Sequence, residues 1–473
     1  MTASRTAFAG RGQDASGSAE EARSRRWLVA GLIAFAVSFG YYLAYLLSHR
    51  QGAWMAPVDI KVYRAGGLIV LHHKPDYNGR LASPLYDWKG LFGTLKFTYT
   101  PFAALAFAVL ALFPLSVLLK LTLAVNVAAM IAAIWFTLGG LGQRDQRSRL
   151  GGTLLLAAPL LFSEPVQRVL WLGQIELVLM ALIMWDMCQP DDRRWKGIGV
   201  GIAAGIKLVP GIFIAYLLLT RRFRQAAVAA GTFAATVLIG FAALPGDSVP
   251  YWFRGVFFQG GRTGFVGWVG NQSLEAMITR FAGSVAAGRL GWLIAAVVVI
   301  AIGLAAAVVW ERAGHEVIGV LTVALAGILA SPISWDHHWV WLVPGVTVMA
   351  SYAARAAGAR RWWLLGLTAL TLAAYAAWPS YFFGERADLG SFSMGLIFLA
   401  PGTNIADYYK YGDQPWFLEY HWRGWQLIAG NMFVLAGLAL LLLAGVLAVR
   451  LVLRARREGR PLFEAARRVA PAA

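Results

Sequence analysis

The residues of this chain that could do chemistry are ionisable side chains that interrupt long apolar runs. Asp59 and Tyr63 are four positions apart, so on a helix they would share one face. Lys207 stands in the middle of an apolar run and offers a positive charge that could meet a phosphate. His337 and His338 follow a proline between two apolar runs and are candidates for contact with a phosphate or a sugar. Ionisable groups are costly in apolar surroundings, so each of these residues is a functional candidate.

Amide and acidic side chains extend this candidate set. Gln174 and Glu176 follow a proline-containing break between two apolar runs, and Asn271 and Gln272 lie in the polar segment 246–287. The two adjacent histidines have no third ligand at an obvious spacing, which disfavours a zinc site. The sequence contains no glycine-rich phosphate loop, no serine nucleophile elbow and no pair of cysteines.

Several of these candidates also have a structural explanation. Asp59 could cap a helix or pair with Lys61, and residues 173–176 could form a simple turn. Lys207 could extend its ammonium group to a membrane surface. Its position in the middle of a run weakens that explanation.

The elements that must position these side chains are membrane-spanning helices. The chain has 473 residues, of which 59% are apolar and 14% charged, with a mean hydropathy of +0.59. A soluble chain carries about 25% charged residues. The composition therefore predicts an all-α polytopic membrane protein. The twelve candidate spans are 27–47, 98–118, 119–139, 150–163, 170–188, 197–219, 226–245, 288–311, 313–332, 334–352, 362–380 and 425–450.

Strict alternation of these spans meets one conflict, because it would place the basic segment 144–149 on the outer side. Either region 98–139 crosses the membrane once, or segment 197–219 is a hairpin of two short helices. Lys207 and Pro210 in the middle of that segment favour the hairpin.

The charge distribution predicts the orientation. Most of the 42 basic residues lie in short segments between apolar runs and at the two ends, which are expected in the cytoplasm. The surplus of +18 is therefore interpreted as a topology signal rather than a nucleic-acid surface. We expect a disordered cytoplasmic tail over 1–26, a transmembrane domain over 27–450 and a basic cytoplasmic tail over 451–473. The expected external loops are 48–97, 246–287 and 381–424.

Six short motifs occur in a fixed order along the chain, and as a set they resemble one family. The motifs are Asp59-x-x-x-Tyr63, Phe97-Thr98-Tyr99-x-Pro101-Phe102, Gly173-Gln174-Ile175, Gly205-Ile206-Lys207-Leu208-x-Pro210, Asn271-Gln272-Ser273-Leu274 and Ser331-Pro332-Ile333-Ser334-Trp335-x-His337-His338-Trp339. The set resembles the bacterial integral-membrane GT-C mannosyltransferases that take mannose from polyprenyl phosphate. These include enzymes that extend phosphatidylinositol mannosides with α-1,2-linked mannose. Thr100, Glu176 and Asp336 depart from the residues common in that family.

The resemblance implies a GT-C fold with about 12 transmembrane helices and a large first external loop. It implies transfer of mannose, with inversion, from a β-linked polyprenyl-phosphate donor to a hydroxyl of an envelope glycolipid or lipoglycan. The implied linkage is α-1,2, and the implied site faces the outside of the bacterial cytoplasmic membrane. No cofactor is expected, and a divalent metal is possible but not required.

The resemblance also suggests roles for the candidate residues. Asp59 would act as the general base. The leaving lipid phosphate would be bound by Lys207, His337 and His338. Hydroxyl groups of the sugar or acceptor would be oriented by Tyr63, Gln174, Glu176, Asn271 and Gln272.

Two alternatives remain open at the level of sequence. The same fold could use another polyprenyl-phosphate sugar, such as glucose or arabinose. A lipid-linked sugar transporter or flippase would also place polar groups within spans. The enzyme is favoured because the polar groups concentrate at one face and no two related halves are evident. A nucleic-acid partner is not expected, since the basic residues form no single positive face.

Overall fold

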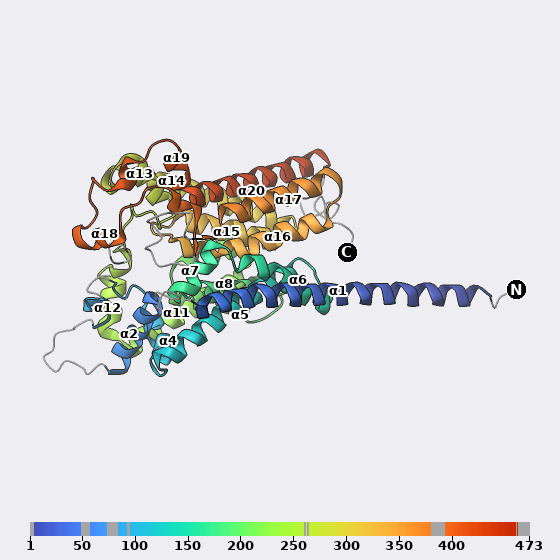
Figure 1. Ribbon diagram of the computed structural model, residues 1–473, viewed down its shortest axis with the longest axis horizontal. Coiled ribbons are helices and arrows are strands. Elements are labelled where there is room, and N and C mark those ends of the chain that lie inside the picture. Colours follow the sequence, from blue (N-terminus) through green and yellow to red (C-terminus); the bar gives the residue numbers. More distant parts are fainter. Residues whose placement is uncertain are drawn as a thin grey trace.

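The computed structural model describes residues 4–48, 57–72, 84–91, 95–259, 262, 264–379, 393–459 and 461. The described chain is a bundle of α-helices with one antiparallel pair of two-residue strands (Figure 1). Much of the first expected external loop, the start of the third and most of the C-terminal tail lie outside the described residues.

Five described helices are long and apolar enough to cross a membrane. They are α1 (Ser4–Ser48), α5 (Leu115–Gly140), α11 (Phe223–Ala243), α14 (Val285–Arg312) and α20 (Met432–Arg457). Shorter helices complete the bundle: α6 (Gln146–Leu160), α7 (Glu164–Leu172), α8 (Glu176–Met187), α9 (Ile198–Ile206), η1 (Val209–Gly211), α10 (Ile212–Leu219), α15 (Glu316–Ala330), η4 (Asp336–Trp341), α16 (Leu342–Arg355) and α17 (Gly358–Ala374).

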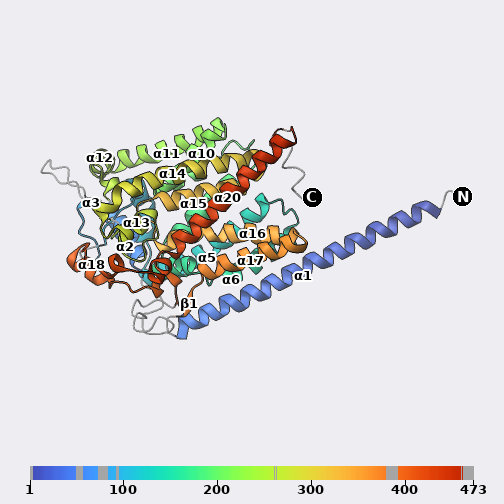
Figure 2. The same ribbon diagram turned by 90° about the horizontal axis from the view of Figure 1, so that it is seen from above.

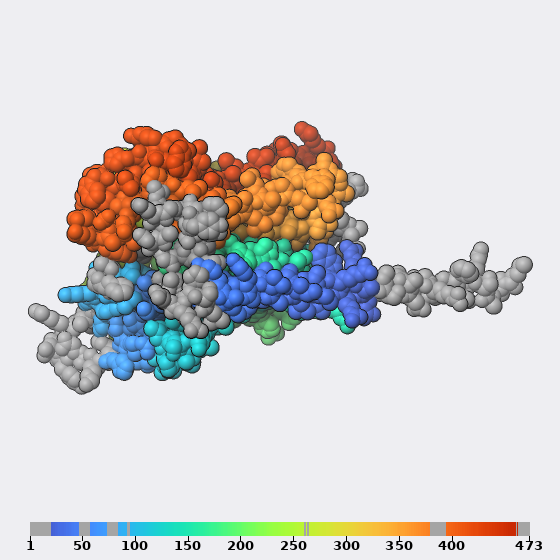
Figure 3. Space-filling model, viewed as in Figure 1, coloured from blue at the N-terminus to red at the C-terminus, as the bar shows by residue number. Residues whose placement is uncertain are grey.

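Short elements cover one end of this bundle. They are α2 (Val58–His72), α3 (Pro84–Asp87), α4 (Pro101–Ala111), α12 (Pro245–Phe253), η2 (Val256–Phe258), α13 (Leu274–Ala282), β1 (Trp378–Pro379), β2 (Ser393–Met394), η6 (Leu396–Leu399), α18 (Ile405–Tyr411), η7 (Leu418–His421) and α19 (Trp425–Ala429). In Figure 3 the elements that follow β2, in orange, and the elements around α2 and α4, in blue to cyan, gather at this end. The start of α1 and the end of α20 lie at the other end (Figure 1).

An ion-pair network marks that other end, which we call the basic end. The Lys196 Nζ lies 2.8 Å from Asp191 and 3.2 Å from Glu316, and the Arg222 Nε lies 3.1 Å from Asp191. Arg222 also pairs with Glu316. Because Lys196 precedes α9 and Arg222 follows α10, both ends of the segment 197–219 lie in one place.

The segment 197–219 is therefore a hairpin, as Lys207 and Pro210 predict. Gly197 packs against Gln225 and Gly205 against Thr236, so α9 runs in the same direction as α11. The segment then breaks after Ile206 and returns along α15 as α10. Lys207 lies at the tip of this hairpin, away from the basic end.

The predicted count of twelve spans is not confirmed. By length and composition the described residues supply five spans, or six if α7 and α8, which are bent by 117°, form one broken span. The expected span 98–118 covers the 11-residue α4 and only the first four residues of α5. The helix α4 is about 16 Å long against the ~30 Å of a bilayer core. Within 98–139, α5 alone is long enough to cross.

The disorder predicted for the N-terminal tail stays a prediction. The composition of residues 1–26 predicts disorder. The helix α1 begins at Ser4 and is continuous to Ser48.

The break between α7 and α8 depends on Gly173. This residue has a φ of 73°, a left-handed conformation that glycine adopts without strain. A Cβ at this position would come within 2.9 Å of the side chain of Ile60. The glycine therefore both turns the chain and lets the start of α2 pack against the break.

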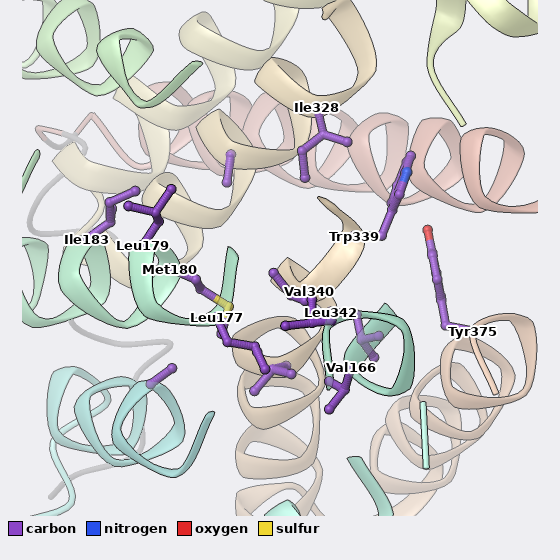
Figure 4. Packing of buried hydrophobic residues seen from close by; sticks show 14 of the residues in the cluster. Val166, Leu177, Leu179, Met180, Ile183, Ile328, Trp339, Val340, Leu342 and Tyr375 are labelled. Carbon is purple, nitrogen blue, oxygen red and sulfur yellow. The ribbon is translucent and has the colours of Figure 1, made fainter. Parts of the chain in front are cut away.

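The core of the bundle holds η4 in place. Figure 4 shows Val340 and Leu342 among the side chains of Val166 and Leu177, which come from α7 and α8. Trp339 stacks near Tyr375 with ring centroids 5.6 Å apart. The apolar residues of η4 thus fix its backbone, and with it the two histidines that precede them.

Candidate active site

Four interruptions of helical structure bring the candidate residues together. Asp59 and Tyr63 lie in the first turns of α2, and Glu176 is the first residue of α8. Lys207 follows the last residue of α9, and His338 lies in η4. Each of these residues lies at or near the end of a helix. Their polar side chains can therefore face one another instead of facing the apolar core along a continuous helix.

We call the group formed by Asp59, Tyr63, Glu176, Lys207 and His338 the cluster. Lys207 lies at its centre. Its Nζ forms an ion pair with Glu176 and lies 2.9 Å from the Nε2 of His338. The same Nε2 lies 3.4 Å from the Oε1 of Glu176. The side chain of Glu176 is 7% exposed and that of Lys207 is 23% exposed. The ammonium group is therefore held by Glu176 and His338, and the Lys207 side chain is still partly exposed. A cation that binds a phosphate needs both features.

Tyrosine and amide side chains form the wall beside Asp59. The Tyr63 hydroxyl donates to the Oε1 of Gln174 and lies 2.7 Å from the Tyr99 hydroxyl. The ring of Tyr99 lies 5.9 Å from the Lys207 Nζ. The predicted residues Tyr63 and Gln174 thus adjoin the Asp59 carboxylate. Tyr99, which belongs to the motif around Phe97, is an additional member and links them to the lysine.

The environment of Asp59 suits a general base. Burial is the main cause that raises the pKa of Asp59 to about 6, and the carboxylate of Glu176 adds to this rise. His337 and a hydrogen bond from Gln174 act on this pKa in the opposite direction. A carboxylate with such a pKa is a stronger base than an ordinary aspartate and is still mostly ionised at neutral pH.

A buried chain of charged groups orients His337. The Nδ1 of His337 lies 3.2 Å from Asp336, whose other oxygen lies 3.2 Å from the Nε of Arg168. Arg168 also pairs with Glu164 at 3.4 Å. The Nε2 of His337 is buried and has no hydrogen-bond partner within the described parts of the chain. Asp336 therefore holds one ring nitrogen while the other stays available to a substrate.

Arg168 is a functional candidate that the sequence did not identify, whereas Glu164 is one of the acids of the proline-containing break, where the sequence predicts chemistry. They are four residues apart on α7, which is a common spacing for an ion pair. Their connection to the histidine runs through Asp336, far along the sequence, and no local pattern reveals it.

Asn271 and Gln272 lie beside the segment that leads into η4 and bind backbone. The Asn271 side chain donates to Val266 and Pro332 and accepts from the Ser334 amide at 2.9 Å. The Gln272 amide donates to two carbonyl groups at 2.7 and 2.8 Å. Both residues are fully buried. In this arrangement their amide hydrogens hold the segment before η4 in place, and none of these hydrogens is left for a sugar hydroxyl.

Arg280 stabilises the same region. Its guanidinium donates to Gly267 at 3.1 Å, to Trp268 at 2.8 Å and to the Asn431 side chain at 2.6 Å, and the residue is 2% exposed. One planar cation thus satisfies several buried oxygen atoms from separate loops. Lysine has the charge but cannot reproduce this planar set of donors.

We therefore expect Arg280→Lys to lower thermal stability markedly. Each buried oxygen left without a donor costs about 1–3 kcal/mol. The melting temperature of the purified protein in detergent measures the effect, and Arg254→Lys, at an exposed arginine, serves as the matched control. A melting temperature of Arg280→Lys equal to that of the control would show that this network does not hold the fold.

Three side chains at this site could also ligate a metal ion. Ligand atoms of Glu176, His337 and His338 all lie within 4.8 Å of one another. Glu176 is the third ligand that spacing alone does not reveal. The Lys207 ammonium already contacts two of the three groups, so the protein itself supplies a positive charge where a metal ion would otherwise provide one.

The cluster is recessed from the surface of the bundle. The 12-residue α8 and the 15-residue α15 both connect it to the basic end, and their lengths are about 18 and 22 Å. The 26-residue α5 is about 39 Å long by the same measure. A phosphate carried on a membrane lipid could therefore reach the cluster without leaving the depth of a bilayer.

The comparisons with known proteins define the class of this chain. Residues 97–332 match the model of glycosyltransferase family 87. The chain is 30% identical over 341 residues to a polyprenol-phosphate-mannose-dependent alpha-(1-2)-phosphatidylinositol mannoside mannosyltransferase of Mycobacterium tuberculosis, covering 68% of this chain and 75% of the relative. It is 33% identical over 322 residues to a polyprenol-phosphate-mannose-dependent alpha-(1-2)-phosphatidylinositol pentamannoside mannosyltransferase of the same species, covering 67% and 70%.

A third relative, from Mycolicibacterium smegmatis, has the same description as the first and is 32% identical over 339 residues, covering 67% of this chain and 74% of the relative. No solved structure shows a significant match to the chain. The protein is a membrane glycosyltransferase. It belongs to glycosyltransferase family 87, which confirms the resemblance drawn from the motifs and the prediction of an enzyme rather than a flippase.

Proposed function

We propose that the protein transfers mannose from a polyprenyl-phosphate-mannose donor to a hydroxyl of a phosphatidylinositol mannoside or related envelope glycolipid, forming an α-1,2 linkage with inversion. The observation that carries this proposal is the meeting of Asp59 and Lys207 in one recessed cluster. A base and a phosphate-binding cation are the two groups that such a transfer needs. The names of the relatives support mannose and the acceptor class.

The proposed step is a single displacement. The acceptor oxygen attacks the anomeric carbon of the mannose while Asp59 takes the hydroxyl proton. The bond between that carbon and the phosphate oxygen breaks, and polyprenyl phosphate leaves with the electron pair. Lys207 and His338 stabilise the negative charge on the leaving phosphate. A β-linked donor would thus give an α-linked product.

Two buried polar atoms are positioned to orient the sugar. The Oε2 of Glu176 has no hydrogen-bond partner among the described residues, and neither has the Nε2 of His337. The Glu176 oxygen can accept a hydrogen bond from a sugar hydroxyl, and the His337 nitrogen can form one with such a hydroxyl. We retain Tyr63, Gln174 and Glu176 as the sugar-orienting residues of the proposal.

The proposed orientation places the basic end in the cytoplasm. Arg454, Arg456 and Arg457 close α20 there, and α1 begins at the same end. Basic residues near span ends are retained on the cytoplasmic side. The cluster then opens toward the outer face, where lipid-linked mannose and glycolipid acceptors would meet.

The pKa of Asp59 predicts a pH dependence. Because the raised pKa is about 6, the base is ionised above that pH and protonated below it. We expect the transfer rate to be nearly constant above pH 7 and to fall about tenfold per unit well below pH 6. Initial rates between pH 4.5 and 8, with donor binding measured at each pH, test this; a rate unchanged down to pH 5 would contradict it.

Lys207 predicts that transfer does not need an added divalent metal. Its ammonium group supplies the charge that would otherwise come from a metal ion held by Glu176, His337 and His338. We expect the rate after chelation and buffer exchange to remain within about twofold of the untreated rate. A large loss that is restored by one divalent metal would instead assign these three residues to a metal site.

A donor and acceptor panel tests the proposed substrates. Purified protein in lipid nanodiscs is incubated with radiolabelled polyprenyl-phosphate mannose, glucose or arabinose and with glycolipid acceptors that carry different numbers of mannose residues. The proposal predicts label transfer from the mannose donor to a phosphatidylinositol mannoside. Transfer from the glucose or arabinose donor alone would support the alternative sugar.

A further inference from the structure

A hollow adjoins η4 at Trp339, and its lining includes neither Lys207 nor His338. It is a groove of about 470 Å³ between α16 and α17 on one side and α20 on the other. Figure 2 shows α20, in red, crossing α15 diagonally and diverging from α17 toward the basic end. The groove is lined almost entirely by apolar side chains, among them Leu325, Val348, Leu367 and Leu443. Such a groove inside a membrane protein matches a hydrocarbon chain.

The charged groups of this groove lie near the basic end. Arg360 lines the groove from the first turn of α17, and Arg450 and Arg454 line it from the last turns of α20. Arg360 and Arg450 have no ion-pair partner within the described residues, and Arg454 pairs with Glu458 at 2.8 Å. Three guanidinium groups against one carboxylate leave a net positive charge at this mouth.

An aromatic and a histidine side chain complete the mouth. The Tyr352 hydroxyl lies 2.9 Å from the Nδ1 of His315, and both residues line the groove beside Arg360. Trp363 also lines it and is 53% exposed. Tryptophan and tyrosine favour the level of lipid headgroups. The mouth therefore has the chemistry of a membrane interface, and the groove behind it has the chemistry of a bilayer core.

We propose that this groove binds an anionic phospholipid of the leaflet at the basic end. The phosphate lies between Arg360, Arg450 and Arg454, and an acyl chain runs along α16. This helix has 14 residues, or about 21 Å, which exceeds half of the ~30 Å bilayer core. Charge complementarity selects an anionic headgroup, because a zwitterionic lipid would bring its own cation to three arginines.

The inner end of the groove explains why such a lipid matters to the enzyme. Trp339 lines the groove, and it directly follows His338, whose ring contacts Lys207. A chain in the groove packs against Trp339 and so supports η4. The site is separate from the proposed donor site, whose phosphate binds at Lys207, away from the basic end.

Lipid retention by purified protein tests the headgroup. The protein is incubated with equimolar phosphatidylglycerol and phosphatidylcholine in detergent, and retained lipid is measured by native mass spectrometry. We expect wild type to retain phosphatidylglycerol, and the triple variant Arg360→Gln, Arg450→Gln, Arg454→Gln to retain about tenfold less or lower still. The control variant Arg312→Gln, Arg361→Gln, Arg457→Gln removes the same charge from residues at the same end that do not line the groove.

A glycine in the groove offers a test of the acyl chain. A Cβ at Gly345 would meet no atom within 4 Å, so the side chain of Gly345→Phe would start in open space in the groove. Gly366→Phe is the control, because Gly366 has equally open surroundings but does not line the groove. We expect only Gly345→Phe to reduce phosphatidylglycerol retention by about tenfold, with an unchanged melting temperature.

Three results would overturn the proposal. One is equal phosphatidylglycerol retention in the two triple variants. Another is equal retention of phosphatidylcholine and phosphatidylglycerol by wild type. The third is recovery of polyprenyl phosphate, rather than a phospholipid, as the lipid that Gly345→Phe displaces. None of these measurements depends on transfer activity, so they leave the proposed reaction untouched.

Discussion

Replacing Asp59 by asparagine is expected to lower the rate of mannose transfer about a hundredfold or more, while folding and donor binding are retained. Asparagine keeps the size of the side chain and its hydrogen bond to Gln174 but cannot take a proton from the acceptor hydroxyl. Asp59 lies at a pKa of about 6 in wild type, so the lost function is that of an ionised base. Transfer rates in nanodiscs and donor affinity, measured side by side, check this result.

The matched control is Asp192→Asn, which removes an exposed aspartate at the basic end. This variant should transfer mannose at the wild-type rate. If Asp59→Asn retains a rate within a few-fold of the control, Asp59 is not the base. The pH profile gives a second readout, because the fall in rate below pH 6 should disappear in the residual activity of Asp59→Asn.

Replacing Lys207 by methionine is expected to lower transfer about a hundredfold or more as well, through the leaving phosphate rather than the acceptor. The ammonium group pairs with Glu176 and lies 2.9 Å from His338. Its removal also leaves the buried Glu176 carboxylate without its cation, and this should lower the melting temperature. Rate, donor affinity and melting temperature are therefore all needed for this variant.

A double variant separates the two effects of Lys207. In Lys207→Met, Glu176→Gln the unpaired carboxylate is gone, so most of the stability should return. Transfer should stay low, because the phosphate still lacks its cation. Recovery of transfer together with stability would show that Lys207 acts only as a structural partner of Glu176.

The sequence predicted the centre of the site but not its supports. Lys207 was identifiable because a charge within an apolar run has few explanations. Asp59 and His338 were identifiable because their motifs resemble those of a known family. The roles of Glu164 and Arg168 depend on contacts with Asp336 across the fold. Such contacts join residues that are distant in the sequence, and a single sequence does not show which of them are close in space.

Asn271 and Gln272 show the opposite limit. A short polar motif has the same sequence whether its side-chain amides contact a substrate or bind backbone carbonyl groups. In this structure the amides donate to carbonyl groups. The membrane spans show a similar limit, because hydropathy detects apolar length but not breaks. The bend of 117° between α7 and α8 falls beside Gly173, and the predicted spans 150–163 and 170–188 did not include it. The hairpin at Lys207 was predicted only because a charge and a proline coincided there.

The most direct test of the proposed reaction is the anomeric configuration and linkage of the product. Wild-type protein is incubated with β-linked polyprenyl-phosphate mannose and a phosphatidylinositol mannoside, and the product is analysed by NMR and by digestion with a linkage-specific mannosidase. The proposal predicts α-1,2-linked mannose and one polyprenyl phosphate released for each mannose transferred, with neither formed at a comparable rate by Asp59→Asn. A β-linked product, or a donor that crosses the membrane without forming a glycosidic bond, would contradict the single displacement at this site.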